Sequence, residues 1–179
     1  MYGWSITTKA LHMCCFSSPP KRVASTSILS RLDQDRQFIA YGMQLSASKE
    51  LAMILPIPVV PGCPEDSVEF ISLEEYKTLF SDLHGWFNPL PKGGGRGLHA
   101  ARGSTSPSLV VHSVGAFDAS FVPSIADFSR LDRRFRIDAE IWNAWPRYAD
   151  YGFAVFKLKA GDNQQVHPMA FSFTSRDPS

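Results

Sequence analysis

Cysteine and histidine are the residues whose chemistry could make this chain a catalyst. The chain of 179 residues holds three cysteines and five histidines. Met13 directly precedes Cys14, so a start at Met13, or removal of the preceding segment, would make Cys14 the N-terminal residue. An N-terminal cysteine carries its own α-amine as a general base for the thiol, which suits attack on an amide. His167 is the candidate for a further catalytic role in such a site.

A resemblance rests on the same residues. Cys14 opens the run Cys-Cys-Phe-Ser, and Arg31 ends a strand-like segment from Val23 to Arg31. A strand that opens with cysteine, with an arginine on the next strand, resembles the N-terminal nucleophile amidohydrolases. The resemblance implies a thiol amidohydrolase that uses Cys14 and Arg31, within two sheets packed between long helices. This chain has too few helical segments to supply those helices. We favour the alternative, in which Cys14 and Cys15 are small buried residues of the first strand.

A glycine-rich segment is the second candidate site. Residues 86–107 contain Asn-Pro, Leu-Pro and three consecutive glycines, which predicts a loop of roughly twenty residues. Lys92 and Arg96 flank the glycines and are candidate ligand-binding residues, because backbone N–H groups in such a loop can surround an anion. The segment lacks the Gly-Lys-Ser/Thr ending of a phosphate-binding loop and the spacing of a dinucleotide motif. We therefore favour a flexible loop.

No metal or cofactor is expected. Zinc sites use paired ligands such as Cys-x-x-Cys, and the sequence contains none. It also lacks Gly-x-Ser-x-Gly, His-Glu-x-x-His and an EF-hand loop. His112 and His167 both lie in apolar segments, where a hydrogen-bonded histidine at the edge of the core is more common than a catalytic base. Four arginines within residues 130–136 are interpreted as a solvated helix end rather than an anion site.

Composition limits the partners and the compartment. The formal net charge is +1, and the basic residues form no long block, so there is no clear nucleic-acid signal. The longest apolar run, residues 51–61, is too short for a membrane span, which needs ~20 residues. An odd number of cysteines in a chain of this size favours free thiols and a cytoplasmic protein. A protein or a small molecule could be the ligand, and the oligomeric state stays open.

The apolar run also organises the predicted fold. On a strand, five of its side chains would share one buried face: Leu51, Met53, Leu55, Ile57 and Val59. Pro56 and Pro58 lie on the other face and lack N–H donors, which predicts an edge strand or one that leaves the sheet near Pro56. We expect residues 1–12 to form a flexible extension, and residues 13–179 a single domain with the long loop at 86–107.

The remaining patterns predict the other elements. Strands are expected at Val23–Arg31 and Arg36–Ser46, the second pairing as a hairpin with the apolar run, and a C-terminal hairpin joins residues 153–159 to 165–174. Ser72 and Glu75 form a capping box for a helix from Leu73 to His84. Two shorter helices follow. The expected class is α+β, a mainly antiparallel sheet of about six to eight strands with these three helices packed on it. The leading functional expectation is a binding or interaction module.

Overall fold

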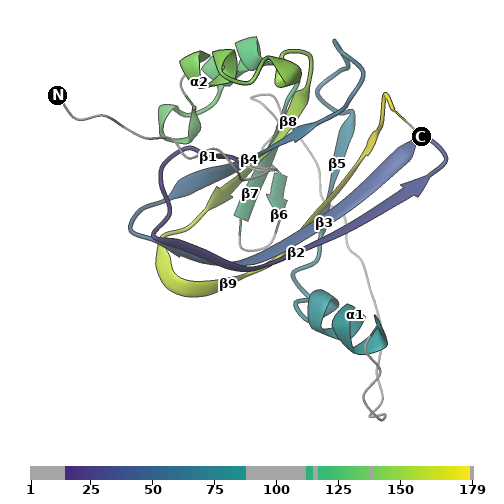
Figure 1. The fold of residues 1–179 in the computed structure, drawn as a ribbon, viewed down its shortest axis with the longest axis vertical. Coiled ribbons are helices and arrows are strands. Elements are labelled where there is room, and N and C mark those ends of the chain that lie inside the picture. The colour runs from purple at the N-terminus through teal and green to yellow at the C-terminus, as the bar shows by residue number, and fades with distance from the viewer. Residues whose placement is uncertain (1–14, 88–111, 115–116, 138, 178–179) are drawn as a thin grey trace.

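Two antiparallel sheets packed face to face form the body of the protein (Figure 1). The computed structural model describes residues 15–87, 112–114, 117–137 and 139–177. In these ranges the strands are β1 (Cys15–Phe16), β2 (Arg22–Asp33), β3 (Arg36–Ala47), β4 (Leu51–Ile57), β5 (Val68–Ser72), β6 (His112–Val114), β7 (Phe117–Val122), β8 (Gly152–Leu158) and β9 (Gly161–Thr174). The helices are α1 (Leu79–Phe87) and α2 (Ala139–Asn143), with 3₁₀ turns η1 (Ile125–Arg130), η2 (Arg133–Phe135) and η3 (Pro146–Tyr148).

The predicted α+β class with mainly antiparallel strands is confirmed. The strands divide into a first sheet in the order β1-β4-β8-β7-β6 and a second sheet in the order β2-β3-β9-β5. The structure thus has two sheets where the sequence predicted one, and nine strands in the described residues. The reason for two sheets is that each inner face is apolar and needs an apolar layer opposite it.

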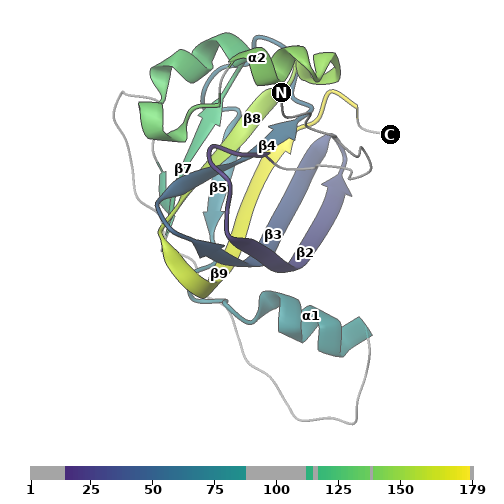
Figure 2. The same cartoon turned by 60° about the vertical axis from the view of Figure 1, so that its left-hand side comes forward.

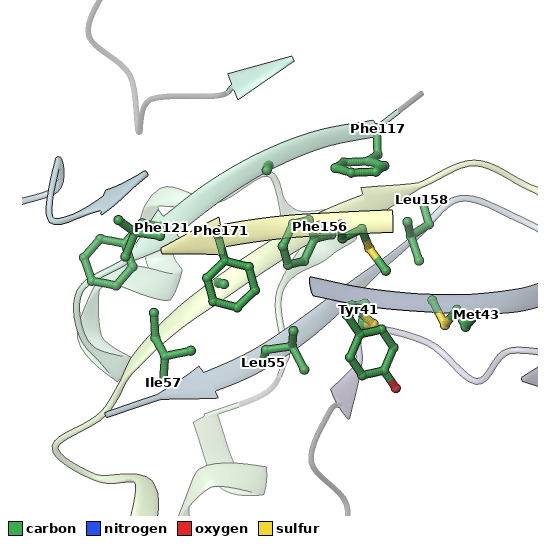
Figure 3. Close-up of a cluster of buried hydrophobic side chains, with 14 of the residues drawn as sticks. Tyr41, Met43, Leu55, Ile57, Phe117, Phe121, Phe156, Leu158 and Phe171 are labelled. Carbon is green, nitrogen blue, oxygen red and sulfur yellow. The ribbon is translucent and has the colours of Figure 1, made fainter. Parts of the chain in front are cut away.

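The apolar run 51–59 forms one wall of the core between the sheets, as predicted. Its five inward-facing side chains are at most 6% exposed. They face Tyr41, Met43 and Leu45 of β3 across the core. Figure 3 shows Leu55, Phe156 and Phe171 in the same cluster, from β4, β8 and β9.

A second core lies on the other face of the first sheet. Ala52 and Ile54 of β4 are fully buried there, together with Val155 of β8. Short helices cover this face, as Figure 2 shows around α2. They contribute Phe128, Leu131, Phe135, Ile137 and Trp142. Strands β4 and β8 are consequently buried on both faces, which makes the first sheet the middle layer of three.

Both predicted hairpins are wrong. β3 pairs with β2 and β9, whereas β4 pairs with β1 and β8. Likewise β8 and β9 lie in different sheets. The links at residues 48–50 and 159–160 are corners that carry the chain from one sheet to the other. A corner and a hairpin both join two alternating apolar rows through a short polar link, so the sequence pattern does not separate them.

The prolines act on pairing as predicted. β1 pairs only with Met53 and Ile54 of β4. Beyond Ile54, β8 is the only strand in the described part of the chain that pairs with β4, and Pro56 lies opposite Phe153. On the edge of β4 that faces away from β8, the missing N–H of Pro56 therefore interrupts no hydrogen bond between described strands.

The predicted helix over Leu73–His84 begins and ends later than expected. Ser72 is the last residue of β5, opposite Met169, and so belongs to a strand rather than to a helix cap. Residues 73–78 form turns, in which Tyr76 N–H donates to Leu73 C=O at 3.0 Å. The helix runs from Leu79 past Gly85 to Phe87 and has no buried residue, so the helix that was expected to pack on the sheet is only partly covered.

The two shorter helices form in the expected places as η1 and α2. They are shorter than typical helices because Pro123 and Pro146 bound the segment and the aromatic side chains of both turn toward β8. None of the described helices has the length and apolarity needed to cross a bilayer.

Candidate functional site

A cleft of about 300 Å³ opens at the end of the sandwich where β8 leads into β9. Its apolar part comes from β3, β7, β8 and β9: Leu45, Phe117, Leu158 and Val166. Its polar part comes from the turn before α1, from the β8–β9 corner and from β9: Lys77, Lys159, Gln164, Gln165 and His167. The cleft therefore has an apolar floor and a polar rim.

His167 lies between the core and the cleft. It is 4% exposed, and its ring stacks on Phe117 with 4.5 Å between ring centroids and 28° between the planes. Its Nδ1 lies 3.2 Å from the carbonyl oxygen of Pro168 and donates to it when Nδ1 carries the proton. The position results from an irregularity between β3 and β9, where Tyr41 pairs with Met169 but Met43 pairs with Val166. This shift holds the imidazole against β7.

The rim carries positive charge. Lys77 and Lys159 are both exposed, and no aspartate or glutamate is among the described residues that line the cleft. A lysine ammonium is a compact charge on a flexible stem, which can follow an anionic group over a shallow rim. No serine, threonine or cysteine lines the described part of the cleft either. The arrangement can bind an anion, and among the described residues it offers no hydroxyl or thiol nucleophile.

The structure does not bring Arg31 and His167 together. Arg31 lies opposite Phe38, on the face of the second sheet that points away from the core. Its side chain is 72% exposed and forms an ion pair with Asp33 at 3.3 Å. His167 instead reaches inward to Phe117. The two residues therefore lie on opposite faces of the same sheet.

The other predicted site residues are Cys14, Lys92 and Arg96, and all three lie outside the described residues. Cys15, next to Cys14, is buried in the second core and pairs with Ile54. The thiol amidohydrolase stays a prediction. An intact mass measured on the protein made from its native gene tests it, because a chain that retains residues 1–13 has no free α-amine at Cys14.

The chain has no match to any protein-family model or to any curated protein. A solved structure that resembles it is the crystal structure of baculovirus P35, with 16% sequence identity and a TM-score of 0.44. The match covers 86% of this chain and 55% of that one, so the chain spans about half the length of P35. A likeness this distant carries no argument for function.

The arginines of residues 130–136 are used within the fold. Arg130 forms ion pairs with Glu65 at 2.5 Å and with Asp127 at 3.3 Å. Arg134 pairs with Asp132 at 2.9 Å, and its hydrogen bonds lower the pKa of that carboxyl to about 2. Arg136 donates to the Leu131 carbonyl at 2.7 Å. Because Arg130, Arg134 and Arg136 already have these partners, few of their N–H groups are left to bind an anion.

Sequence reasoning missed the lysines of the cleft. Strict alternation predicts Lys157 and Lys159 on one face, but β8 ends at Leu158. Lys157 lies over the ring of Phe135 at 5.1 Å, on the helix-covered face, whereas Lys159 lines the cleft. The available signal was the Gly-Asp-Asn sequence after Lys159, whose composition is typical of a turn, although these residues begin β9. Among the described residues, no group of three or more His, Cys, Asp or Glu side chains could hold a metal.

Proposed function

We propose that this chain is a binding module that holds a small amphipathic anion in the cleft beside His167. One observation carries the proposal: two lysines stand on the rim of a cleft whose floor is apolar and whose described lining has no carboxylate. The apolar tail of the ligand would lie on Phe117 and Leu158, and its acidic group would lie at the lysines.

The size of the cleft limits the ligand. At about 300 Å³ it is at the small end of ligand pockets, which fits a short-chain or medium-chain carboxylate better than a nucleotide. Burial of the tail supplies the affinity, at roughly 25 cal/mol for each Å² of apolar surface. The lysines select the sign of the head group, because an uncharged or cationic analogue leaves them unpaired or repelled.

The role proposed is binding in the cytoplasm rather than catalysis. The described lining of the cleft provides no hydroxyl, thiol or carboxylate that could attack a substrate. The odd number of cysteines in the chain supports a reducing compartment, because disulfides rarely persist there.

Titration with three ligands of equal chain length tests the proposal. Decanoate, decanol and decyltrimethylammonium are added below their micellar concentrations, and amide chemical shifts are followed by NMR. We expect decanoate alone to bind tightly, with shifts centred on Val166, His167 and Leu158. Equal binding of decanol, or shifts that avoid these residues, would contradict the proposal.

Lysine variants distinguish anion binding in the cleft from a general effect of the protein's charge on binding. The double variant Lys77→Gln with Lys159→Gln should weaken decanoate binding roughly fivefold, since exposed charge pairs contribute ~0.2–1 kcal/mol each. The matched control is Lys157→Gln, which removes the same charge two residues away, on the face that contacts Phe135. If this control weakens binding as much as the double variant does, the cleft is not the site.

A further inference from the structure

The second sheet has one long open edge. Of the strands at the sheet edges, β1 has 2 residues, β6 has 3 and β5 has 5, whereas β2 has 12. β2 pairs with β3 on one side, and no described strand pairs with its other side. Proteins commonly keep edge strands short, because a free row of N–H and C=O groups invites another strand to pair.

The exposed edge is also apolar. Ile28 is 42% exposed, Leu32 is 39% exposed and Val23 is 37% exposed. Ile28 lies opposite Tyr41 of the core, and Leu32 lies opposite Gln37, which in turn pairs with the core residue Phe173. These side chains therefore continue the inner face of the sheet beyond the part that the first sheet covers. Figure 2 shows β2 at the margin of its sheet.

Residues 27–33 of β2 carry little of the usual protection against strand pairing, since Arg31 and Asp33 are their only charged side chains and pair with each other at 3.3 Å. There is no proline or lysine in the strand. Its one irregularity is the register shift between Ala24 and Ser27. From Ser27 to Asp33 the strand pairs residue for residue with β3. These seven residues form a regular edge that is ready to accept a strand.

The sequence of this edge is complementary to itself. In an antiparallel pair centred on Ser30, Ile28 lies opposite the partner's Leu32, and Leu29 lies opposite the partner's Arg31. A register centred on Arg31 would oppose two like charges, and one centred on Leu29 would place Ile28 opposite a serine. If one copy slides along the other by an odd number of residues, the apolar residues of the two copies lie on opposite faces of the joined sheet. Only an even shift of the register keeps them on the same face.

We propose that a second copy of this chain pairs with β2 through residues 27–33, antiparallel and centred on Ser30. The two four-stranded sheets then form one eight-stranded sheet across a twofold axis. Ile28 and Leu32 of both copies cover one another on the inner face, which removes the exposed apolar surface of the edge. The interface does not involve the cleft, so a failure of the proposed dimer and a failure of the proposed ligand binding are distinguishable.

Light scattering coupled to size-exclusion chromatography tests the interface over a concentration series of the full chain. We expect a dimer that dissociates on dilution. Ile28→Lys places an inward-pointing charge on the edge and should convert the dimer to a monomer. Val60→Lys is the matched control, because Val60 is 50% exposed and lies outside β2. This variant should remain dimeric, and thermal melts should show that both variants are folded.

Cysteine cross-linking tests the register. Ser30→Cys would face its own copy across the axis and should form an intermolecular disulfide under mild oxidation, identified by peptide mapping. Ser27→Cys is the control: the two thiols would lie ~20 Å apart at 3.4 Å per residue, beyond the Cα separation of ~7 Å that a disulfide allows. It should not cross-link.

Three results would overturn the proposal. The first is a wild-type chain that is monomeric at all concentrations. The second is a dimer that Ile28→Lys leaves intact. The third is a monomer that becomes a dimer only when residues 1–14 are removed, because the occupant of the edge would then be the chain's own N-terminal segment.

Discussion

The ring of Phe80 lies against Gly42, so closely that a Cβ atom at Gly42 would come within 2.6 Å of Phe80 Cε2. Gly42 faces away from the core, between Tyr41 and Met43, which face into it. Helix α1 has no buried residue, and this contact is a point at which the helix meets the second sheet. The position of α1 therefore depends on the absence of a side chain at residue 42.

Replacing Gly42 with alanine should loosen α1 without unfolding the sandwich. The added methyl group displaces the Phe80 ring, which is half-buried and can swing toward solvent. We expect amide hydrogen exchange in residues 79–87 to become several times faster, with a global cost below ~1 kcal/mol. The control is Gly85→Ala, which has nothing within 4 Å and should instead stabilise the helix by ~0.5–1 kcal/mol. Unchanged exchange in Gly42→Ala would contradict the docking contact.

Gly152→Ala should destabilise the whole fold. A Cβ atom at Gly152 would lie 2.6 Å from Phe121 Cε2 and 2.7 Å from Val59 Cγ2, and both side chains are buried. Overpacking of this kind costs ~1–3 kcal/mol. Chemical denaturation measures the loss, and adding Val59→Ala to Gly152→Ala should recover part of it. A double variant less stable than the sum of the two single changes would argue against this steric cause.

Two substitutions at Trp142 should differ in their cost. Trp142 stacks on Phe128 with 5.4 Å between centroids, yet its buried Nε1 has no hydrogen-bond partner among the residues that the structure describes. Trp142→Phe keeps an aromatic ring and removes the unpaired N–H, whose burial costs ~1–3 kcal/mol, so we expect a loss below ~2 kcal/mol. Trp142→Ala leaves a cavity and should cost ~3–5 kcal/mol. Equal losses in urea unfolding would show that the indole N–H is bound after all.

The carboxyl of Asp132 should titrate at about 2 instead of 3.8, because Arg134 donates side-chain and backbone hydrogen bonds to its charged form. A pKa that is lowered in the folded state adds stability above the unfolded pKa of 3.8, and this contribution disappears as the pH falls through about 2. Carbon-detected NMR follows the titration. Arg134→Gln should raise the midpoint toward 3.8, whereas Arg133→Gln should leave it low. A midpoint near 3.8 in the unchanged protein would rule out the pair.

The candidate site could be predicted only in part. The apolar environment of His167 could be predicted from the sequence, because His167 lies in an alternating row with Met169 and Phe171. Its neighbours in the cleft were not, since Lys77, Phe117 and Lys159 come from three distant segments. No short-range pattern links such residues, and only the packing of two sheets brings them to one end of the sandwich.

The sequence by itself determined one buried face of the apolar run 51–59 and where most strands lie. Alternation of apolar residues placed the row 51–59 correctly, because the period of a strand is a local property of the backbone. Tertiary structure alone decided which strands pair, where α1 begins and which lysines share a cleft. The physical reason is that short links such as residues 48–50 permit either a hairpin or a corner, and the choice is made by burial of both apolar faces of β4 and β8.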